Sequence, residues 1–262
     1  MITKIYKYVP FSEGSLCILN NGTIKYSHSN EFNDPFDCVV DYNIEETIKN
    51  ISEREDLFER AAEQLGTGLD VIEEKKKIML ASLEESLTNK TPYDSVMDKI
   101  GICCFSLKPD NILMWSHYAE NHKGFLVEFT TDQSNPDIVE STEKYLGGYL
   151  VEYSDKMPVR SLGLSECESS QEDLYKQFLT KSAVWFYESE FRVLSLNKGP
   201  GIHQFCQNMV SAVIAGAKMG DAHIQILSDT VNNLSSKLQK NIGFSKAEMI
   251  KGKYALKLNL SK

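Results

Sequence analysis

Strand-like segments in this chain are short, and helical segments lie between them at no regular spacing. Alternating or apolar runs predict strands at residues 2–9, 101–107, 125–129, 191–196 and 210–215, because side chains point alternately to the two faces of a strand. The order does not follow the strand–helix–strand period of a doubly wound sheet. It predicts an α+β fold whose core is a mixed, mostly antiparallel sheet.

Residues 44–90 differ from the rest of the chain. They are rich in Glu, Lys and Leu, and their apolar residues recur at helical spacing. Gly66-Thr67-Gly68 interrupts this pattern, which predicts two helices. We therefore expect one α+β domain over residues 1–262, with residues 44–90 inserted as a helical hairpin.

Composition excludes several classes of protein. Of the 262 residues, 42% are hydrophobic and 25% are charged, as in ordinary globular proteins. Net charge is −9, which argues against a broad nucleic-acid surface. The six cysteines form no Cys-x-x-Cys pair, and no histidine pair has zinc spacing, so no metal site is predicted. No apolar run is long enough to span a membrane, and a cytoplasmic protein is expected.

Residues 181–192 (Lys-Ser-Ala-Val-Trp-Phe-Tyr-Glu-Ser-Glu-Phe-Arg) concentrate charged and aromatic side chains. If a strand begins at Tyr187, Glu188, Glu190 and Arg192 share one face of it. Taken alone, the pattern is more simply explained as an exposed strand with a Glu–Arg ladder. Together with the two segments described next, it predicts a ligand site.

The first of these segments is residues 113–124. A helix is expected over residues 111–120, with Asp110 or Asn111 as the cap. Helical spacing would bring Ser116 to Glu120 and Tyr118 to His122. The aromatic residues could form a wall for a flat base, and the lysine could bind a phosphate. Equally, the aromatic residues could cover the sheet while the histidines lie at the surface. The candidate residues here are Trp115, Ser116, His117, Tyr118 and Lys123.

The second segment, Phe32-Asn-Asp-Pro-Phe-Asp37, surrounds a rigid turn. Asn33 or Asp34 is expected to form an Asx-turn, with Phe32 and Phe36 as anchors. Asp37 is then available to act elsewhere.

The N-terminal strand contributes Lys7 and Tyr8, which would face opposite sides. Lys7 could meet a phosphate or one of the glutamates, or it could be an ordinary exposed lysine.

These segments resemble a prokaryotic family described as a domain of unknown function. The motifs that carry the resemblance are Tyr6-Lys-Tyr8, Phe32–Asp37, Leu113-Met-Trp-Ser-His-Tyr-Ala-x-x-His-Lys-Gly124 and Trp185-x-Tyr-Glu-x-Glu-x-Arg192. They span most of the chain outside the predicted hairpin. The resemblance implies a setting in phage defence or among toxin-like effectors.

A weaker resemblance is to ADP-ribosyltransferases, as analogy only. Residues 5–9 and 16–19 look like the opening strand and helix of that fold, Ser27 like its polar strand end, and Glu188-x-Glu190 like its closing motif. The chain departs from that family in having Lys7 where many members have His or Arg. Residues 115–118 are only a substitute for the Tyr element of the family.

This second resemblance implies an NAD site and transfer of ADP-ribose to an unknown protein or nucleic acid, or cleavage of NAD. Glu190 would stabilise positive charge on the ribose, Glu188 would accept a proton, and Arg192 would hold Glu190. Trp185 or Trp115 would stack on a ring of the ligand.

Two other functions stay open. One is a metal-dependent nuclease or phosphoesterase that uses Asp34, Asp37, His117 and Glu190, because clustered carboxylates suit Mg²⁺. The other is a non-catalytic module that binds a nucleotide-like ligand. We predict that Asp37, His117 and Glu190 face one concavity, the commonest geometry for a ligand site.

Overall fold

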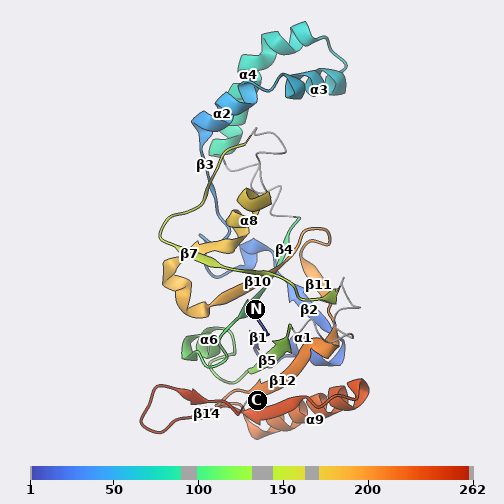
Figure 1. Ribbon diagram of the computed structural model, residues 1–262, viewed down its shortest axis with the longest axis vertical. Coiled ribbons are helices and arrows are strands. Elements are labelled where there is room, and N and C mark those ends of the chain that lie inside the picture. Colours follow the sequence, from blue (N-terminus) through green and yellow to red (C-terminus); the bar gives the residue numbers. More distant parts are fainter. Residues whose placement is uncertain (1, 90–98, 132–143, 163–170, 260–262) are drawn as a thin grey trace. The chain divides into compact units, whose positions relative to one another are not determined.

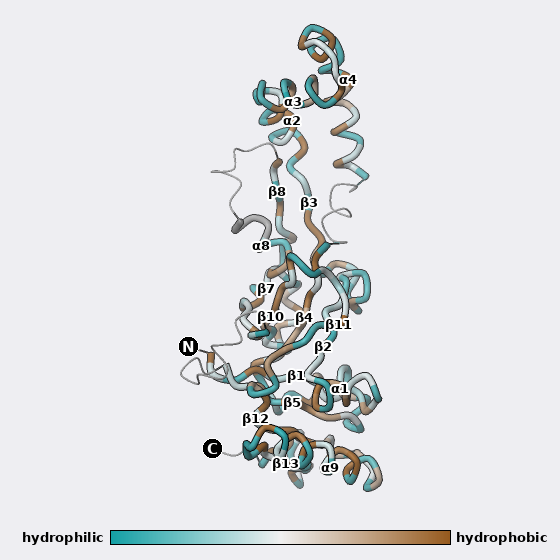
Figure 2. The backbone as a smooth tube through the Cα atoms, turned by 90° about the vertical axis from the view of Figure 1, so that its right-hand side faces the viewer, coloured by the Kyte–Doolittle hydropathy of each residue, from teal (hydrophilic) through white to brown (hydrophobic). Residues whose placement is uncertain are grey.

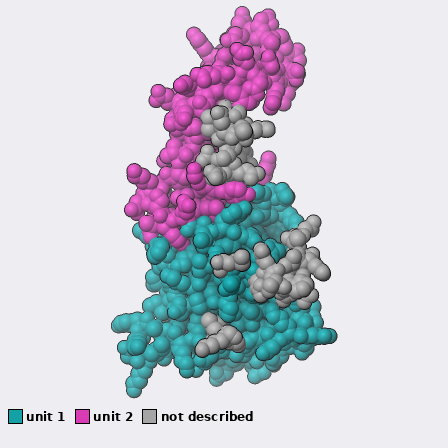
Figure 3. Space-filling model, in the orientation of Figure 1, with its two compact units in different colours: residues 1–28, 100–151, 184–262 teal, residues 29–99, 152–183 magenta. Residues whose placement is uncertain are grey.

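The structure is a computed structural model that describes residues 2–89, 99–131, 144–162 and 171–259. The chain divides into two units, which Figure 3 shows in different colours. Unit 1 comprises residues 1–28, 100–151 and 184–262, and unit 2 comprises residues 29–99 and 152–183. Unit 2 is therefore larger than the predicted insertion, because a second segment of chain belongs to it.

A seven-stranded sheet forms the centre of unit 1, with strand order β13-β12-β5-β1-β4-β10-β6 (Figure 1). Its neighbours pair antiparallel except for β12 and β13, which are parallel. The predicted α+β class with a mostly antiparallel sheet is therefore confirmed. The strands are β1 (Lys4–Val9), β4 (Gly101–Ser106), β5 (Phe125–Thr130), β6 (Tyr149–Leu150), β10 (Glu190–Ser195), β12 (Val210–Ala215) and β13 (Gly243–Lys246).

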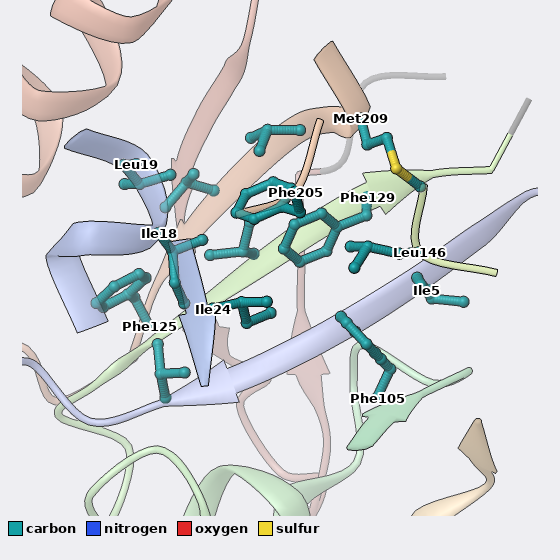
Figure 4. Packing of buried hydrophobic residues seen from close by; sticks show 14 of the residues in the cluster. Ile5, Ile18, Leu19, Ile24, Phe105, Phe125, Phe129, Leu146, Phe205 and Met209 are labelled. Carbon is teal, nitrogen blue, oxygen red and sulfur yellow. The ribbon is translucent and has the colours of Figure 1, made fainter. Parts of the chain in front are cut away.

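The two faces of this sheet carry different side chains, because residues alternate along each strand. On one face, Ile5, Phe105, Phe125 and Phe129 belong to one hydrophobic core, which Figure 4 shows. Helices α1 (Glu13–Asn20) and α9 (Asp221–Leu238) contribute Ile18, Leu19, Leu227, Val231 and Leu234 to the same core. We call this the α1/α9 face.

The opposite face carries Tyr6 and Tyr8 of β1, and it is covered in part by helix α6 (Ile112–His117). Met114 and Trp115 of α6 are buried against these tyrosines. We call this the α6 face. Glu190 lies opposite Ser106, and Ser106 lies opposite Tyr6, so all three belong to the α6 face.

Local sequence signals explain where two helices of unit 1, α1 and α6, begin. The Ser12 side chain accepts a hydrogen bond from the Ser15 N–H and caps α1. The Asn111 side chain accepts from the N–H groups of Leu113 and Met114 and caps α6, as predicted. Such caps satisfy N–H groups that have no partner within the helix.

Smaller elements complete unit 1. They are the pair β2 (Thr23–Tyr26) and β11 (Gly201–Gln204), the pair β14 (Glu248–Met249) and β15 (Leu256–Lys257), and the 3-10 helices η3 (Ala183–Glu188) and η4 (Gln207–Met209).

In unit 2, residues 44–88 form three helices where two were predicted. They are α2 (Ile44–Ser52), α3 (Glu55–Leu65) and α4 (Leu69–Thr88). Gly66 ends α3 with φ of 61°, a left-handed conformation that glycine adopts without strain. Phe58, Ala62 and Ile72 form a small core between α3 and α4. Hydrophilic and hydrophobic residues are mixed along both helices (Figure 2).

The rest of unit 2 is built from short pieces. They are η1 (Ser29–Glu31), α8 (Gln171–Leu179) and two parallel strand pairs, β3 (Asp41–Tyr42) with β8 (Val159–Arg160) and β7 (Glu152–Ser154) with β9 (Thr180–Ser182).

None of the helices in the described residues is both long enough and apolar enough to span a membrane.

Candidate functional site

The backbone changes from a 3-10 helix to a β-strand between Glu188 and Glu190. Residues 183–188 form η3, Ser189 has φ of 46°, and strand β10 begins at Glu190. The prediction that Glu188, Glu190 and Arg192 share one strand face is therefore wrong for Glu188, because the residue precedes the strand. Glu190 and Arg192 do share a face, as predicted.

Glu190 and Arg192 form a buried ion pair on the α6 face. Arg192 Nε donates to Glu190 Oε1 at 2.9 Å, and Arg192 Nη2 donates to Oε2 at 3.1 Å. The two residues are 4% and 0% exposed. Two parallel, charge-assisted hydrogen bonds hold the carboxylate in one orientation. The predicted role of Arg192, to hold Glu190, agrees with this geometry.

Glu188 has a different partner. The Tyr118 hydroxyl donates to Glu188 Oε1 at 2.6 Å, and Glu188 is 2% exposed while Tyr118 is half-buried. The backbone of the same glutamate is also held, since Ser106 Oγ donates to its carbonyl oxygen at 2.6 Å. The Glu188 carboxylate is therefore buried, and its hydrogen-bond partner Tyr118 is partly exposed to solvent.

Aromatic rings surround this phenol. His117 lies with its ring centroid 6.4 Å from that of Tyr118 and 6.4 Å from that of Tyr187. The Tyr187 ring lies 5.9 Å from that of Trp185. His117 is exposed, and Trp185 and Tyr187 are half-buried. Helix α6 and η3 thus bring together four of the rings singled out in the sequence.

Trp115, in contrast, belongs to the core. It is 0% exposed, its Nε1 donates to the Pro109 carbonyl at 2.9 Å, and its ring packs edge-on against Tyr8 at 5.3 Å. Its other neighbour is His122, which stacks on it at 6.3 Å. In this conformation Trp115 has no ring surface to offer a ligand, so the alternative that it covers the sheet fits the structure better.

Helix α6 ends earlier than the sequence predicted. It stops at His117, and Glu120, Asn121 and His122 follow with φ of 50°, 55° and 68°. The expected contacts at helical spacing therefore do not form. Instead, the left-handed turn carries His122 back, so that its Nε2 lies 3.1 Å from Ser116 Oγ.

Glycine is required directly after this turn. A Cβ on Gly124 would lie 2.1 Å from the Val9 carbonyl oxygen, so no other residue fits without moving strand β1. The His-Lys-Gly part of the motif thus has a structural explanation. Lys123 precedes this glycine and is exposed.

The remaining candidates of unit 1 are mostly tied to backbone. Lys7 Nζ donates to the Cys104 carbonyl at 2.8 Å and lies 5.5 Å from the Phe105 ring on the α1/α9 face, the face opposite Glu190. Tyr8 donates its hydroxyl proton to the Lys108 carbonyl at 2.6 Å. Ser27 forms an isolated bridge with Ile102.

Asp37 belongs to unit 2. Its Oδ2 lies 3.3 Å from Lys181 Nζ, and both side chains are buried. The predicted Asx-turn is present, because the Phe36 N–H donates to Asp34 Oδ1 at 2.9 Å. Phe36 is 68% exposed, so the expectation that it anchors the loop is wrong. The convergence of Asp37 with His117 and Glu190 stays a prediction.

No group of three or more His, Cys, Asp or Glu side chains suited to a metal ion occurs among the residues that the structure describes.

Sequence analysis missed three contributors to the site: Ser106, Lys108 and Asn111. Ser106 ends β4, and Lys108 and Asn111 lie in the connection between β4 and α6. They contact residues 186–188 through the hydrogen bonds and the ring contact described below. Their only local signal was the capping role of Asn111.

The comparisons with known proteins bear on this region of the chain. A family model described as "Protein of unknown function (DUF2971)" matches residues 114–193. Comparison with curated proteins and with solved structures found no match. Over residues 114–193 the chain is therefore similar to a family of proteins of unknown function, and the matched range includes Tyr118, Glu188, Glu190 and Arg192.

Proposed function

We propose that unit 1 binds NAD, or a dinucleotide like it, and transfers or hydrolyses its ADP-ribose group. The observation that carries the proposal is the short hydrogen bond from the Tyr118 hydroxyl to Glu188, beside the rings of His117, Trp185 and Tyr187. Half-exposed rings suit the flat bases of a dinucleotide. A carboxylate joined to a phenol suits proton transfer.

The two glutamates take different roles in this proposal. Both oxygens of Glu190 accept from Arg192, two residues further along the same strand, so we assign Glu190 a positioning role at the start of β10. Glu188 accepts from the neutral hydroxyl of Tyr118, a residue that is half-buried. The proton-accepting role therefore belongs to the Tyr118–Glu188 pair.

In the reaction, the bond between the ribose C1′ and the nicotinamide nitrogen breaks, and its electron pair neutralises the ring nitrogen. A water molecule, or a nucleophilic group of a target, forms the new bond to C1′. The nucleophile gives its proton to the Tyr118 oxygen while the phenol proton moves to Glu188. The negative charge of Glu188 also stabilises the positive charge that develops on the ribose.

Nicotinamide release from NAD, measured together with NAD binding by calorimetry, tests this proposal. Tyr118→Phe and Glu188→Gln should each lower nicotinamide release by roughly a hundredfold or more, as for loss of a general base, while NAD still binds. Lys251→Ala, an exposed lysine of the same unit, is the control and should match the wild type.

Two results would contradict the proposal. The first is no NAD binding by the wild-type protein at millimolar concentration. The second is NAD binding without turnover, which would instead favour a non-catalytic nucleotide-binding module.

A further inference from the structure

The connection between β4 and α6 is attached along its length to the end of η3. The Leu107 N–H donates to the Ser189 carbonyl at 2.9 Å. At its other end, Asn111 Nδ2 donates to the Tyr187 carbonyl at 2.7 Å. Together with the bond from Ser106 Oγ to the Glu188 carbonyl, these contacts satisfy three successive carbonyl groups. The connection and η3 therefore form one continuous surface of unit 1.

Lys108 lies in the middle of this connection, and its backbone is held on both sides. Its N–H donates to Ser106 Oγ at 3.1 Å, and its carbonyl accepts from the Tyr8 hydroxyl at 2.6 Å. The residue is nevertheless exposed, and its Nζ lies 5.9 Å from the centre of the Phe186 ring. A fixed backbone thus presents an exposed cation near Phe186 of η3, the element that also carries Trp185, Tyr187 and Glu188.

Lys7 and Lys123, which the sequence suggested as phosphate ligands, are less well placed than Lys108 to bind a ligand at η3. Lys7 Nζ is bound to the Cys104 carbonyl on the α1/α9 face, whereas Glu190 and Tyr8 belong to the α6 face. Lys123 follows the left-handed turn and has no contact with η3 among those that the structure records for the described residues. Lys108 is the lysine for which a direct contact with η3 is observed.

We propose that Lys108 binds a phosphate of the ligand whose rings lie against His117, Trp185 and Tyr187, so that the site selects nucleotides over nucleosides. This inference rests on the proposed function. The chemical basis is that a lysine ammonium is a strong point charge for phosphate. A ligand held by a ring at η3 would bring its phosphate within reach of a flexible lysine side chain on the same surface.

Calorimetric titration with ADP and with adenosine tests the inference, because the two ligands differ only in the diphosphate. The wild type should bind ADP more tightly than adenosine. Lys108→Ala should weaken ADP binding by roughly tenfold, the effect of one charge-assisted contact that is partly screened by solvent, and should leave adenosine binding unchanged. Lys108→Arg should retain most of the ADP affinity, and Lys251→Ala should behave as the wild type.

Three outcomes would overturn the inference. Equal affinity of the wild type for ADP and adenosine would show that no phosphate contact exists. Unchanged ADP affinity in Lys108→Ala would assign the phosphate to another residue and leave the proposed function intact. Binding of neither ligand, nor of NAD, by the wild type would overturn the inference together with the proposed function.

Discussion

Two glutamates that flank Ser189 have partners of opposite kinds. Both carboxylate oxygens of Glu190 accept hydrogen bonds from the Arg192 guanidinium, and both side chains are buried. Glu188 accepts from the Tyr118 phenol, which is half-exposed. A buried charge paired with a buried charge serves the stability of the sheet. Under the proposed function, the carboxylate bonded to the neutral phenol of Tyr118 would exchange protons with a ligand.

Arg192→Ala should produce the largest loss of stability. It leaves the Glu190 carboxylate buried without its cation, and removal of one partner of such a pair costs about 3–5 kcal/mol. Urea denaturation followed by circular dichroism measures the loss. The double variant Glu190→Gln/Arg192→Met should be more stable than the single one, and an Arg192→Ala protein as stable as the wild type would show that the pair is not structural.

Tyr118→Phe should have a smaller effect on the free energy of unfolding, about 1.5–3 kcal/mol, because one hydrogen bond to a charged group is removed but no buried ion pair is broken. The same variant should nevertheless lose nicotinamide release, as argued above. The contrast between the two glutamates would fail if Tyr118→Phe unfolded as readily as Arg192→Ala in the same urea series.

Substitution of His122 should have the smallest effect on stability, visible only as a change in how stability depends on pH. Burial, and then the nearby Lys218, lower the pKa of His122 below its ordinary value of 6.5. The unfolded chain therefore binds a proton more readily than the folded protein just below pH 6.5. The stability contribution is fully present above that pH and declines as the pH falls toward the folded pKa.

Melting temperatures between pH 7.5 and 5.5 measure this contribution. His122→Gln should flatten the decline, whereas Lys251→Ala, at an exposed position of the same unit, should leave it unchanged. A wild-type protein that melts at a higher temperature at pH 5.5 than at pH 7.5 would contradict the assignment.

Much of the fold could be predicted from the sequence because its signals are local. The alternation in β1, the caps at Ser12 and Asn111, and the left-handed end of α3 at Gly66 each depend on residues within one turn or one strand. The α+β class follows from the order of these segments. The third helix in residues 44–88 was missed because no glycine or proline lies between the end of α2 at Ser52 and the start of α3 at Glu55.

The sequence alone therefore determined which segments carry unusual residues, but only the tertiary structure decided what each residue does. Tyr118 meets Glu188, Lys108 meets Phe186, and Lys7 meets Cys104. The partners in each of these contacts are far apart in the chain, so no local pattern specifies them. Positive φ values at residues 120–122 and at Ser189 mark where the chain departs from the helix and the strand that the sequence predicts. Non-glycine residues adopt that conformation only where surrounding contacts impose it. The sequence could therefore name Tyr118, Glu188 and Lys7 but not their roles, and it did not point to Lys108.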